Sequence, residues 1–205
     1  MKLLVFGSTG GTGKEIVKQA LEKKYKVIAF ARSSEKLQNI RGIIEIVKGD
    51  VRNQEDVDKA VKNSNVILSA LGTKLFEKPI CEIGVKNIIN SMKKYNKNRI
   101  IVESAYGVKE TRKKGMYAKF LWFLIKQLLI DKEKMEAALE NSNLDWTIVQ
   151  PVLLTNEMRK GNYITGEAKK AFIKGFQKIS RADVADCMIK LIPDKKSFHK
   201  KLVVF

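Results

Sequence analysis

Residues suited to metal binding and to nucleophilic catalysis are scarce in this sequence of 205 residues. Its two cysteines, Cys81 and Cys187, lie far apart, and its one histidine, His199, lies close to the C-terminal end. No CxxC pair, Cys/His cluster or HExxH motif is present, so we expect no metal site. A Ser-His-Asp or Cys-His mechanism would have to use His199, and neither mechanism is expected.

Long apolar segments are also missing. The most apolar stretch, residues 120–125, is interrupted by Lys126 and Gln127, well short of the roughly 20 apolar residues that span a membrane. The apolar run at residues 1–6 stops at Gly7 and is too short for a signal peptide. We therefore expect no membrane span. Two unpaired cysteines without an export signal predict a cytoplasmic protein.

Proline is rare, with three residues, while hydrophobic residues make up 44% and charged residues 30% of the chain. This composition excludes a disordered or low-complexity chain. The length is that of one ordinary domain, and no repeat or linker interrupts it. We expect a single domain over residues 1–205, as a monomer or homodimer.

Arginine is scarce as well, although the net charge is +18. Only seven of the forty basic residues are arginine, and the lysines are spread over nearly every predicted helix. Recognition of bases and bidentate recognition of phosphates favour arginine. We expect a solvated lysine-rich surface and no specific nucleic-acid partner, with a functional basic patch as the alternative.

Short β-branched runs alternate with segments of helical periodicity through the first half of the chain. We predict strands at residues 3–6, 26–31, 43–47, 65–70 and 99–103, and helices at 14–24, 54–62 and 80–95. Continuous apolar strands indicate a sheet covered by helices on both faces. The alternation predicts an α/β fold with a doubly wound parallel sheet, a Rossmann fold.

The second half is less regular. Residues 117–141 predict one long helix or two in succession, and residues 146–150 a strand closed by Pro151. Residues 154–177 show no clear period. Ser180 as N-cap, with Asp183 reaching back, predicts a helix through Leu191, and residues 202–205 form a last strand. We expect a small C-terminal portion to cover the substrate.

The strongest motif is a glycine-rich segment that directly follows the first strand and opens a helix. It consists of Gly7, Ser8, Thr9, Gly10, Gly11, Thr12 and Gly13. Gly7 permits a tight turn, Gly10 lets a pyrophosphate approach the backbone, and Gly13 allows close packing of helix on sheet. The amides of residues 9–12 would then face an anion at the positive end of the helix. The alternative is an ordinary strand-helix turn; a P-loop is excluded because Glu15 follows Lys14.

The end of the second strand indicates which dinucleotide binds. An NAD enzyme places a carboxylate there for the ribose 2′-hydroxyl. This sequence has Arg32 followed by Ser33, which suits a 2′-phosphate. We therefore predict NADP(H), unless Arg32 is a solvated surface residue.

Six motifs follow one another along nearly the whole chain. They are Gly-x-x-Gly-x-x-Gly after the first strand, Arg32 after the second, Gly49-Asp50-Val51, Ala70-Leu71-Gly72, residues 144–151 (LDWTIVQP) and residues 180–185 (SRADVA). In these motifs and their order the sequence resembles the atypical short-chain dehydrogenase/reductase superfamily, in particular biliverdin reductase B/flavin reductase-like and NmrA-like proteins.

The resemblance implies further cofactor contacts. Asp50 would bind the adenine amino group, with Val51 against the ring, unless Asp50 is only a helix cap or turn residue. Ala70, Leu71 and Gly72 would line the adenosine ribose and pyrophosphate. Near the nicotinamide the resemblance places Pro151, Val152 and Leu153, although Pro151 can also simply end a strand.

Two departures from the family pattern concern the chemistry. The family's Tyr-x-x-x-Lys places a proton-donating tyrosine four residues before a ribose-binding lysine, and here Lys132 fits the lysine whereas Leu128 replaces the tyrosine. Gln150 stands where the family commonly has arginine. Lys132 can still bind the nicotinamide ribose, unless it is a solvated helix lysine.

Without that tyrosine, a conjugated acceptor such as a flavin, quinone or bilin is favoured over a simple ketone, because the latter needs a positioned proton donor. We expect acceptor contacts mainly from residues 104–120 and 154–178. Ser104 would bind the nicotinamide amide or an acceptor carbonyl, and Tyr106 would stack on a planar acceptor. The plain alternatives are a helix cap for Ser104 and a partly buried loop aromatic for Tyr106.

Two hypotheses therefore remain: an NADPH-dependent reductase, or a non-catalytic NADP(H) sensor of the NmrA-like kind. The basic run Lys109, Arg112, Lys113 and Lys114 would attract an anionic acceptor or is merely solvated. An apolar segment follows it, made of Met116, Phe120, Trp122, Phe123, Ile125, Leu128 and Leu129. We favour a helix buried on the sheet there; the alternatives are a dimer face, a membrane-surface helix or a lid.

Overall fold

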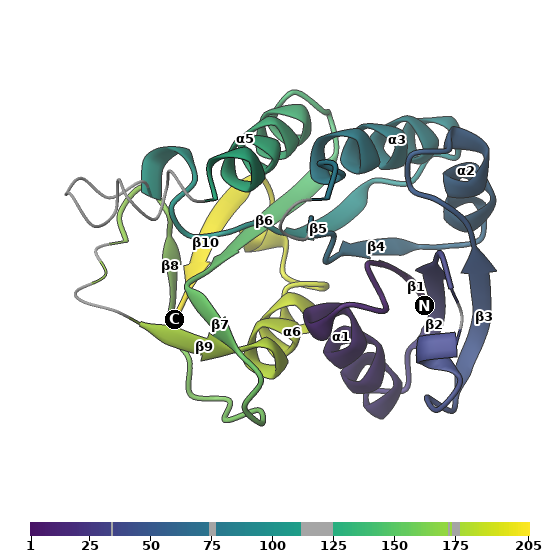
Figure 1. Cartoon of the computed structure of the whole chain (residues 1–205), viewed down its shortest axis with the longest axis horizontal. Helices are drawn as coiled ribbons and strands as arrows, with labels where there is room; N and C mark the ends of the chain where they lie inside the picture. Colours follow the sequence, from purple (N-terminus) through teal and green to yellow (C-terminus); the bar gives the residue numbers. More distant parts are fainter. Residues whose placement is uncertain (34, 74–76, 112–124, 172, 174–176) are drawn as a thin grey trace.

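The computed structural model describes residues 1–33, 35–73, 77–111, 125–171, 173 and 177–205. Within them, eight strands form one sheet in the order β3-β2-β1-β4-β5-β6-β10-β8, and β7 pairs with β9 separately (Figure 1). The strands are β1 (Lys2–Phe6), β2 (Lys26–Ala31), β3 (Ile43–Lys48), β4 (Val66–Ser69), β5 (Arg99–Glu103), β6 (Asp145–Pro151), β7 (Leu153–Thr155), β8 (Thr165–Glu167), β9 (Lys178–Ser180) and β10 (Lys200–Val204). β8 runs antiparallel to β10, and the other pairs in the large sheet are parallel.

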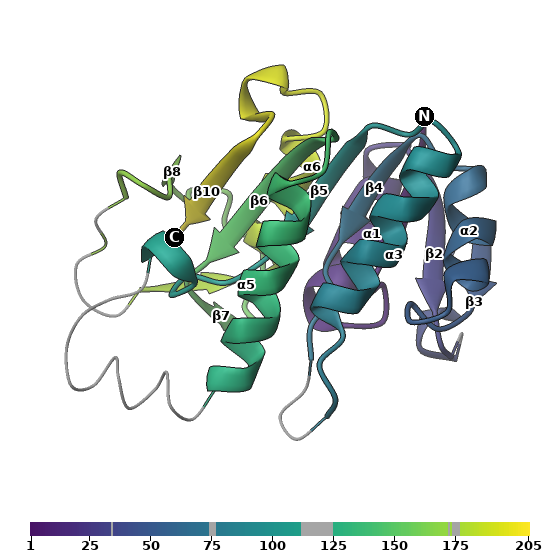
Figure 2. The same cartoon turned by 90° about the horizontal axis from the view of Figure 1, so that it is seen from above.

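Helices cover both faces of this sheet (Figures 1 and 2). They are α1 (Gly11–Glu22), α2 (Gln54–Lys62), α3 (Cys81–Lys94), α5 (Lys126–Glu140) and α6 (Arg181–Lys190), with short 3₁₀ turns η1 (Glu35–Leu37), η2 (Lys109–Thr111) and η3 (Lys195–Ser197). α1 and α6 pack on one face, and α2, α3 and α5 on the other. The predicted α/β Rossmann fold in a single domain is confirmed.

The strand order changes direction at β1: β2 and β3 follow on one side of it, and β4, β5 and β6 on the other. β1 pairs with β2 on one side and with β4 on the other, both in parallel. In doubly wound sheets this point leaves a crevice at the carboxyl ends of the two strands, where ligands bind. The glycine-rich loop follows β1 and therefore lies at this crevice.

Most predicted elements of the first half lie where the periodicity puts them, but α1 begins at Gly11, three residues before the prediction, because the loop turns directly into the helix. Of the predicted helix at 117–141, the described part is α5, and residues 112–124 lie outside the description. The segment 154–177, for which no period was visible, contributes the short strands β7 and β8.

The N-terminus of α6 is capped by Ser180, as predicted: its Oγ accepts a hydrogen bond from the amide of Asp183. The return contact differs from the expected capping box. Asp183 Oδ2 accepts from the Ser180 hydroxyl, while Oδ1 accepts from the amides of Lys160 and Gly161. Asp183 thereby fastens the segment between β7 and β8 to α6.

Both cysteines are free and buried. Burial raises the pKa of both thiols, that of Cys187 to about 12. Within the described part of the chain, no helix has the length and apolar character needed to cross a membrane.

Candidate functional site

The glycine-rich loop is held so closely that two of its glycines have no room for a side chain. Gly7 has a φ of 72°, and a Cβ there would lie 2.4 Å from the carbonyl oxygen of Ala70. A Cβ on Gly13 would lie 2.0 Å from the carbonyl oxygen of Gly7. Gly10 is exposed, and its Cβ would come no closer than 3.2 Å to the protein. The close packing thus needs Gly7 and Gly13, whereas a Cβ on the exposed Gly10 would meet a single close neighbour, the carbonyl oxygen of Gly7.

The loop presents free amides at the N-terminus of α1. Among the described residues, the amides of Thr9, Gly11 and Thr12 have no hydrogen-bond acceptor. Gly10 differs from the expectation, because its amide donates to Gly7 O at 2.9 Å and closes the turn. Three amides at a helix N-terminus, above a glycine with no side chain, fit the pyrophosphate of a dinucleotide.

Two hydroxyl side chains of the loop point inward and brace it. Ser8 is fully buried and donates to Phe30 O, at the end of β2, over 2.8 Å. Thr12 donates to Glu103 Oε1, at the end of β5, over 3.0 Å. Both hydroxyls therefore fix the loop to the sheet.

The residues expected at the adenosine end lie after β2 and β3. Arg32 is exposed and Ser33 is half-buried. Asp50 accepts hydrogen bonds from the backbone and guanidinium of Arg52, which together with the charge of Arg32 lower the pKa of its carboxyl. Arg32 thus lies within electrostatic range of Asp50. Asp50 holds a turn, and the N-cap of α2 is Asn53.

Lys132 lies between the ends of β4 and β5. Its Nζ donates to Leu71 O at 3.1 Å and to Glu103 O at 2.9 Å. These bonds exclude the alternative of a solvated helix lysine.

Val51 and Leu71 are buried, and Gly84 of α3 lies so close to both that a Cβ there would be 2.8 Å from the Leu71 side chain. Gly72, by contrast, has open space where its side chain would be.

The segment after β5 runs beside the end of β6 and continues the parallel pairing. The amide of Ser104 donates to Val149 O, and that of Tyr106 to Pro151 O. Pro151 is the last residue of β6; Val152 is buried and Leu153 is exposed. Ser104 is not a helix cap, because its hydroxyl donates to Glu136 of α5. Tyr106 packs against the core, and burial raises its pKa.

Sequence reasoning missed four residues that contact the loop or the segment after β5. Glu103 is buried between Thr12 and Lys132, and burial raises the pKa of its carboxyl. Arg181 lies against the loop, since a Cβ on Gly11 would be 2.4 Å from its Cδ. Glu136 is fully buried, and Lys201 pairs with it. Of the four, only Glu103 had a signal in the sequence, as a glutamate at the end of an apolar strand. The other three reach their partners only through the fold.

The described residues also form a pocket of about 360 Å³, but it lies away from the glycine-rich loop. It is lined by residues of η2, α5, β6, β8 and β10, with Lys169, His199 and Lys200 among them. Its charges largely pair with one another: Lys200 with Glu167, and Lys109 with Glu140. Lys109 is therefore not simply solvated, while Arg112, Lys113, Lys114 and residues 116–123 of the apolar segment lie outside the description.

Comparison with known proteins agrees with this geometry. A family model described as NAD(P)H-binding matches residues 7–195. The chain belongs to this NAD(P)H-binding family.

The curated relatives are distant in sequence. TIC 62, a chloroplastic protein of pea (Pisum sativum), is 24% identical over 231 residues, which cover 98% of this chain and 42% of the relative. An uncharacterized chloroplastic protein of Arabidopsis thaliana is 27% identical over 213 residues, covering 97% of this chain and 74% of the relative. The chain thus spans less than half the length of pea TIC 62.

Solved structures share the whole fold. An NAD-dependent epimerase/dehydratase assigned only by similarity, from Bacillus halodurans, has a TM-score of 0.86 at 23% identity, covering 100% of this chain and 94% of that one. ChuY, an anaerobillin reductase of Escherichia coli O157:H7, gives 0.85 at 21%, covering 100% and 97%. A short-chain dehydrogenase/reductase of Veillonella parvula in complex with NADP gives 0.79 at 17%, covering 99% and 93%. The resemblance predicted from the motifs is confirmed for family and fold.

Proposed function

We propose that this protein is an NADPH-dependent reductase of a planar, conjugated acceptor, such as a flavin, a quinone or a bilin. One observation carries the proposal. Lys132 is seated between the ends of β4 and β5, as the family's ribose-binding lysine would be, while the residue one turn earlier on α5 is the half-buried Leu128. This arrangement supports a cofactor site that keeps the ribose-binding lysine and lacks the proton-donating tyrosine.

Residues of this chain account for each part of the cofactor. The amides of Thr9, Gly11 and Thr12 bind the pyrophosphate. Arg32 pairs with the 2′-phosphate, with Ser33 as a second donor, so the preferred cofactor is NADP(H). Asp50 and Val51 receive the adenine, and Ala70, Leu71 and Gly72 the adenosine ribose and pyrophosphate.

At the other end of the crevice, Lys132 holds the nicotinamide ribose. Ser104, Pro151, Val152 and Leu153 surround the nicotinamide. When bound, the cofactor supplies a hydride; the protein orients the two planar rings and excludes water from between them.

The lack of a tyrosine determines the class of acceptor. General acid catalysis contributes about 10²–10⁴-fold to rates that depend on protonating a developing alkoxide. A conjugated acceptor spreads the negative charge over its π system and can take its proton from water, so it loses little of this factor. Tyr106 would stack on such an acceptor. The name of ChuY, an anaerobillin reductase of the same fold, supports a bilin-type acceptor.

The proposal is tested by following the loss of NADPH absorbance with FMN, quinones and biliverdin, and in parallel with aliphatic ketones, at saturating NADPH. We expect turnover of at least one conjugated acceptor and none of the ketones above background. Faster turnover of ketones would contradict it and would point to another proton donor. Tight NADPH binding without turnover of any acceptor would favour the non-catalytic sensor instead.

A cytoplasmic location and a monomeric or homodimeric state belong to the same proposal. Both cysteines are free thiols, which suits a reducing compartment. Chloroplastic relatives show that the fold family also occurs in an organelle.

A further inference from the structure

The hydroxyl of Ser104 is already committed inside the protein. Its Oγ donates to Glu136 Oε1 at 2.5 Å, and both residues are buried, Ser104 at 3% and Glu136 at 0% exposure. A serine hydroxyl has one hydrogen and two lone pairs. Because the hydroxyl hydrogen of Ser104 is donated to Glu136, Ser104 can only accept a hydrogen bond from a ligand.

Two further side chains hold the Glu136 carboxyl in place beside Ser104. Lys201 Nζ lies 2.9 Å from Glu136 Oε2, and Gln150 Nε2 donates to Oε1 over 2.9 Å. The neutral Gln150 lies beside Glu136, and the positive charge comes from β10, the strand next to β6.

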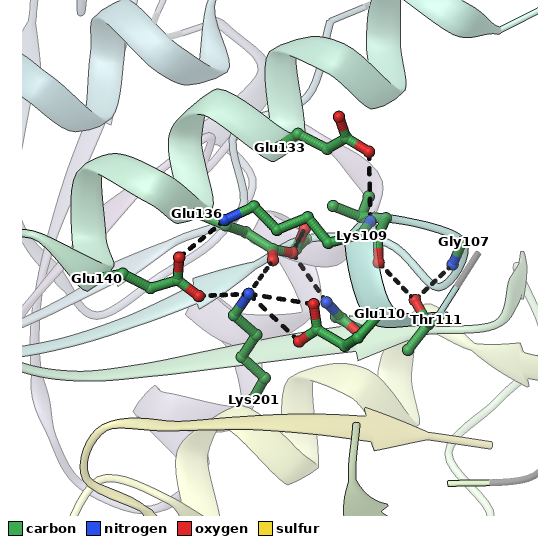
Figure 3. Close-up of polar contacts among 11 residues, drawn as sticks. Gly107, Lys109, Glu110, Thr111, Glu133, Glu136, Glu140 and Lys201 are labelled. Atoms are coloured by element: carbon green, nitrogen blue, oxygen red, sulfur yellow. Dashed lines mark hydrogen bonds and ion pairs between the residues drawn. The ribbon is translucent and has the colours of Figure 1, made fainter. Parts of the chain in front are cut away.

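Lys201 is itself held firmly in place (Figure 3). It is 10% exposed and also pairs with Glu140 of α5 and Glu110 of η2. Burial alone would lower the pKa of Lys201, but the hydrogen bonds to Glu140 and Glu136 outweigh it and raise the pKa. Lys109, on the same turn as Glu110, pairs with Glu140. This ionic cluster of Lys109, Glu110, Glu136, Glu140 and Lys201 ties β10 to α5 and to the turn that follows Ser104.

We propose that Lys201 and Glu136 are positioning residues that make Ser104 a hydrogen-bond acceptor toward the site. The partner of Ser104 is then a donor, the carboxamide N–H of the nicotinamide, and not the carbonyl of the acceptor substrate. The inference rests on the proposed function, which places the nicotinamide beside Ser104. It also explains why Ser104 does not substitute for the missing tyrosine: its proton is not available to polarise a carbonyl.

Lys201→Met removes the cation beside Glu136, so we expect the Glu136 carboxyl to lose its fixed position next to Ser104. Lys200→Met is the matched control, because Lys200 is the neighbouring residue on β10 and pairs with Glu167 instead.

The charges around Glu136 come from known elements, so the result can be reversed by design. Lys201 faces it from β10, Gln150 from β6 and Ser104 from the end of β5, and Glu140 lies one turn away on α5. Adding Gln150→Arg to Lys201→Met returns a cation to Glu136 and should restore the position of its carboxyl.

The experiment compares the binding of NADPH with that of its 3-acetylpyridine analogue, in which a methyl group replaces the carboxamide NH₂. The unaltered protein should prefer NADPH by about two- to tenfold, the range of one net hydrogen bond. Ser104→Ala should bring the ratio close to one. Lys201→Met should lower the ratio toward one, adding Gln150→Arg should restore it, and Lys200→Met should leave it unchanged. An unchanged ratio in Lys201→Met would overturn the role of Lys201.

These binding measurements need no turnover, so a failure of the proposed reductase function can be told apart from a failure of the role proposed for Ser104. A protein that reduces no acceptor but shows the expected ratios would refute the reductase and leave the role of Ser104 standing. A ratio that Ser104→Ala does not change would refute that role whatever the acceptor. If Lys201→Met does not fold, Ser104→Ala and the Gln150→Arg/Lys201→Met double variant still decide the question.

Discussion

Thr12 and Glu103 are 91 residues apart in the chain, yet the hydroxyl of Thr12 donates to the Glu103 carboxyl over 3.0 Å. This bond joins the glycine-rich loop to the end of β5. The ionisable carboxyl of Glu103 is buried directly beneath the place where we expect an anionic cofactor. A charged carboxylate there would repel the pyrophosphate, so its protonation state affects both stability and binding.

Glu103→Gln should stabilise the protein near neutral pH. Burial raises the pKa of Glu103 in the folded protein, so stability is lost as the pH rises from the unfolded pKa through the folded one. The variant should therefore melt higher than the unaltered protein at about pH 8 and similarly at about pH 4. Each unit of pKa difference corresponds to about 1.4 kcal/mol.

Thermal melts over this pH range check the prediction, and Glu167→Gln is the control with the opposite sign. Hydrogen bonding to Lys200 lowers the pKa of the half-buried Glu167, so its replacement should not stabilise the protein at high pH. In addition, NADPH affinity should fall less with rising pH in Glu103→Gln than in the unaltered protein. If Glu103→Gln is less stable than the unaltered protein at pH 8, ionisation of the buried Glu103 does not destabilise the fold and the prediction is wrong.

Arg32→Ala should remove most of the preference for NADPH over NADH. A charge-assisted hydrogen bond to the 2′-phosphate contributes about 1.5–3 kcal/mol, or roughly ten- to hundredfold in affinity. NADH binding should hardly change, since that cofactor has no 2′-phosphate. Isothermal titration with both cofactors measures the ratio. Arg41→Ala removes the same charge from an exposed residue before β3 and should leave the ratio intact.

Gly10→Val and Gly13→Val should separate binding from folding. A Cβ on the exposed Gly10 would lie 3.2 Å from Gly7 O, a contact that a small shift relieves, so that variant should keep most of its melting temperature and lose NADPH binding. At Gly13 the Cβ would lie 2.0 Å from Gly7 O, so that variant should be destabilised by at least the roughly 1–3 kcal/mol typical of overpacking. Melting curves and titrations on both variants test this. Micromolar NADPH binding by Gly10→Val would place the cofactor elsewhere.

Asp131→Ala should destabilise the protein although Asp131 is not expected to touch the cofactor. Its carboxylate, buried on α5, accepts from the amides of Cys81 and Glu82 at the start of α3, and from Thr73 Oγ1. Bonds to a charged group contribute about 1.5–3 kcal/mol, and their loss leaves the first amides of α3 without a partner. Denaturant melts measure the loss. Glu82→Gln, which disturbs only pairs with exposed lysines, should cost much less.

Much of the site was predictable because its signals are local. The tight turn at Gly7, the close packing at Gly13 and the cap at Ser180 each depend on neighbours within a few residues, so the motif alone indicates them. The positions of Arg32, Asp50 and Leu71 follow from the rule that the carboxyl ends of parallel strands meet at one edge of the sheet.

What the sequence alone determined was the α/β alternation, the glycine-rich loop and the strand ends that face a dinucleotide, because backbone periodicity and turn chemistry act over short distances. Only the tertiary structure decided which buried charges meet. Asp131 caps a helix that begins 50 residues earlier, and Lys201 supplies the cation for Glu136 that Gln150 lacks. A buried carboxylate needs a partner, but the chain does not need to supply it from nearby: any strand or helix that the fold brings alongside can do so, and no local pattern records which one does.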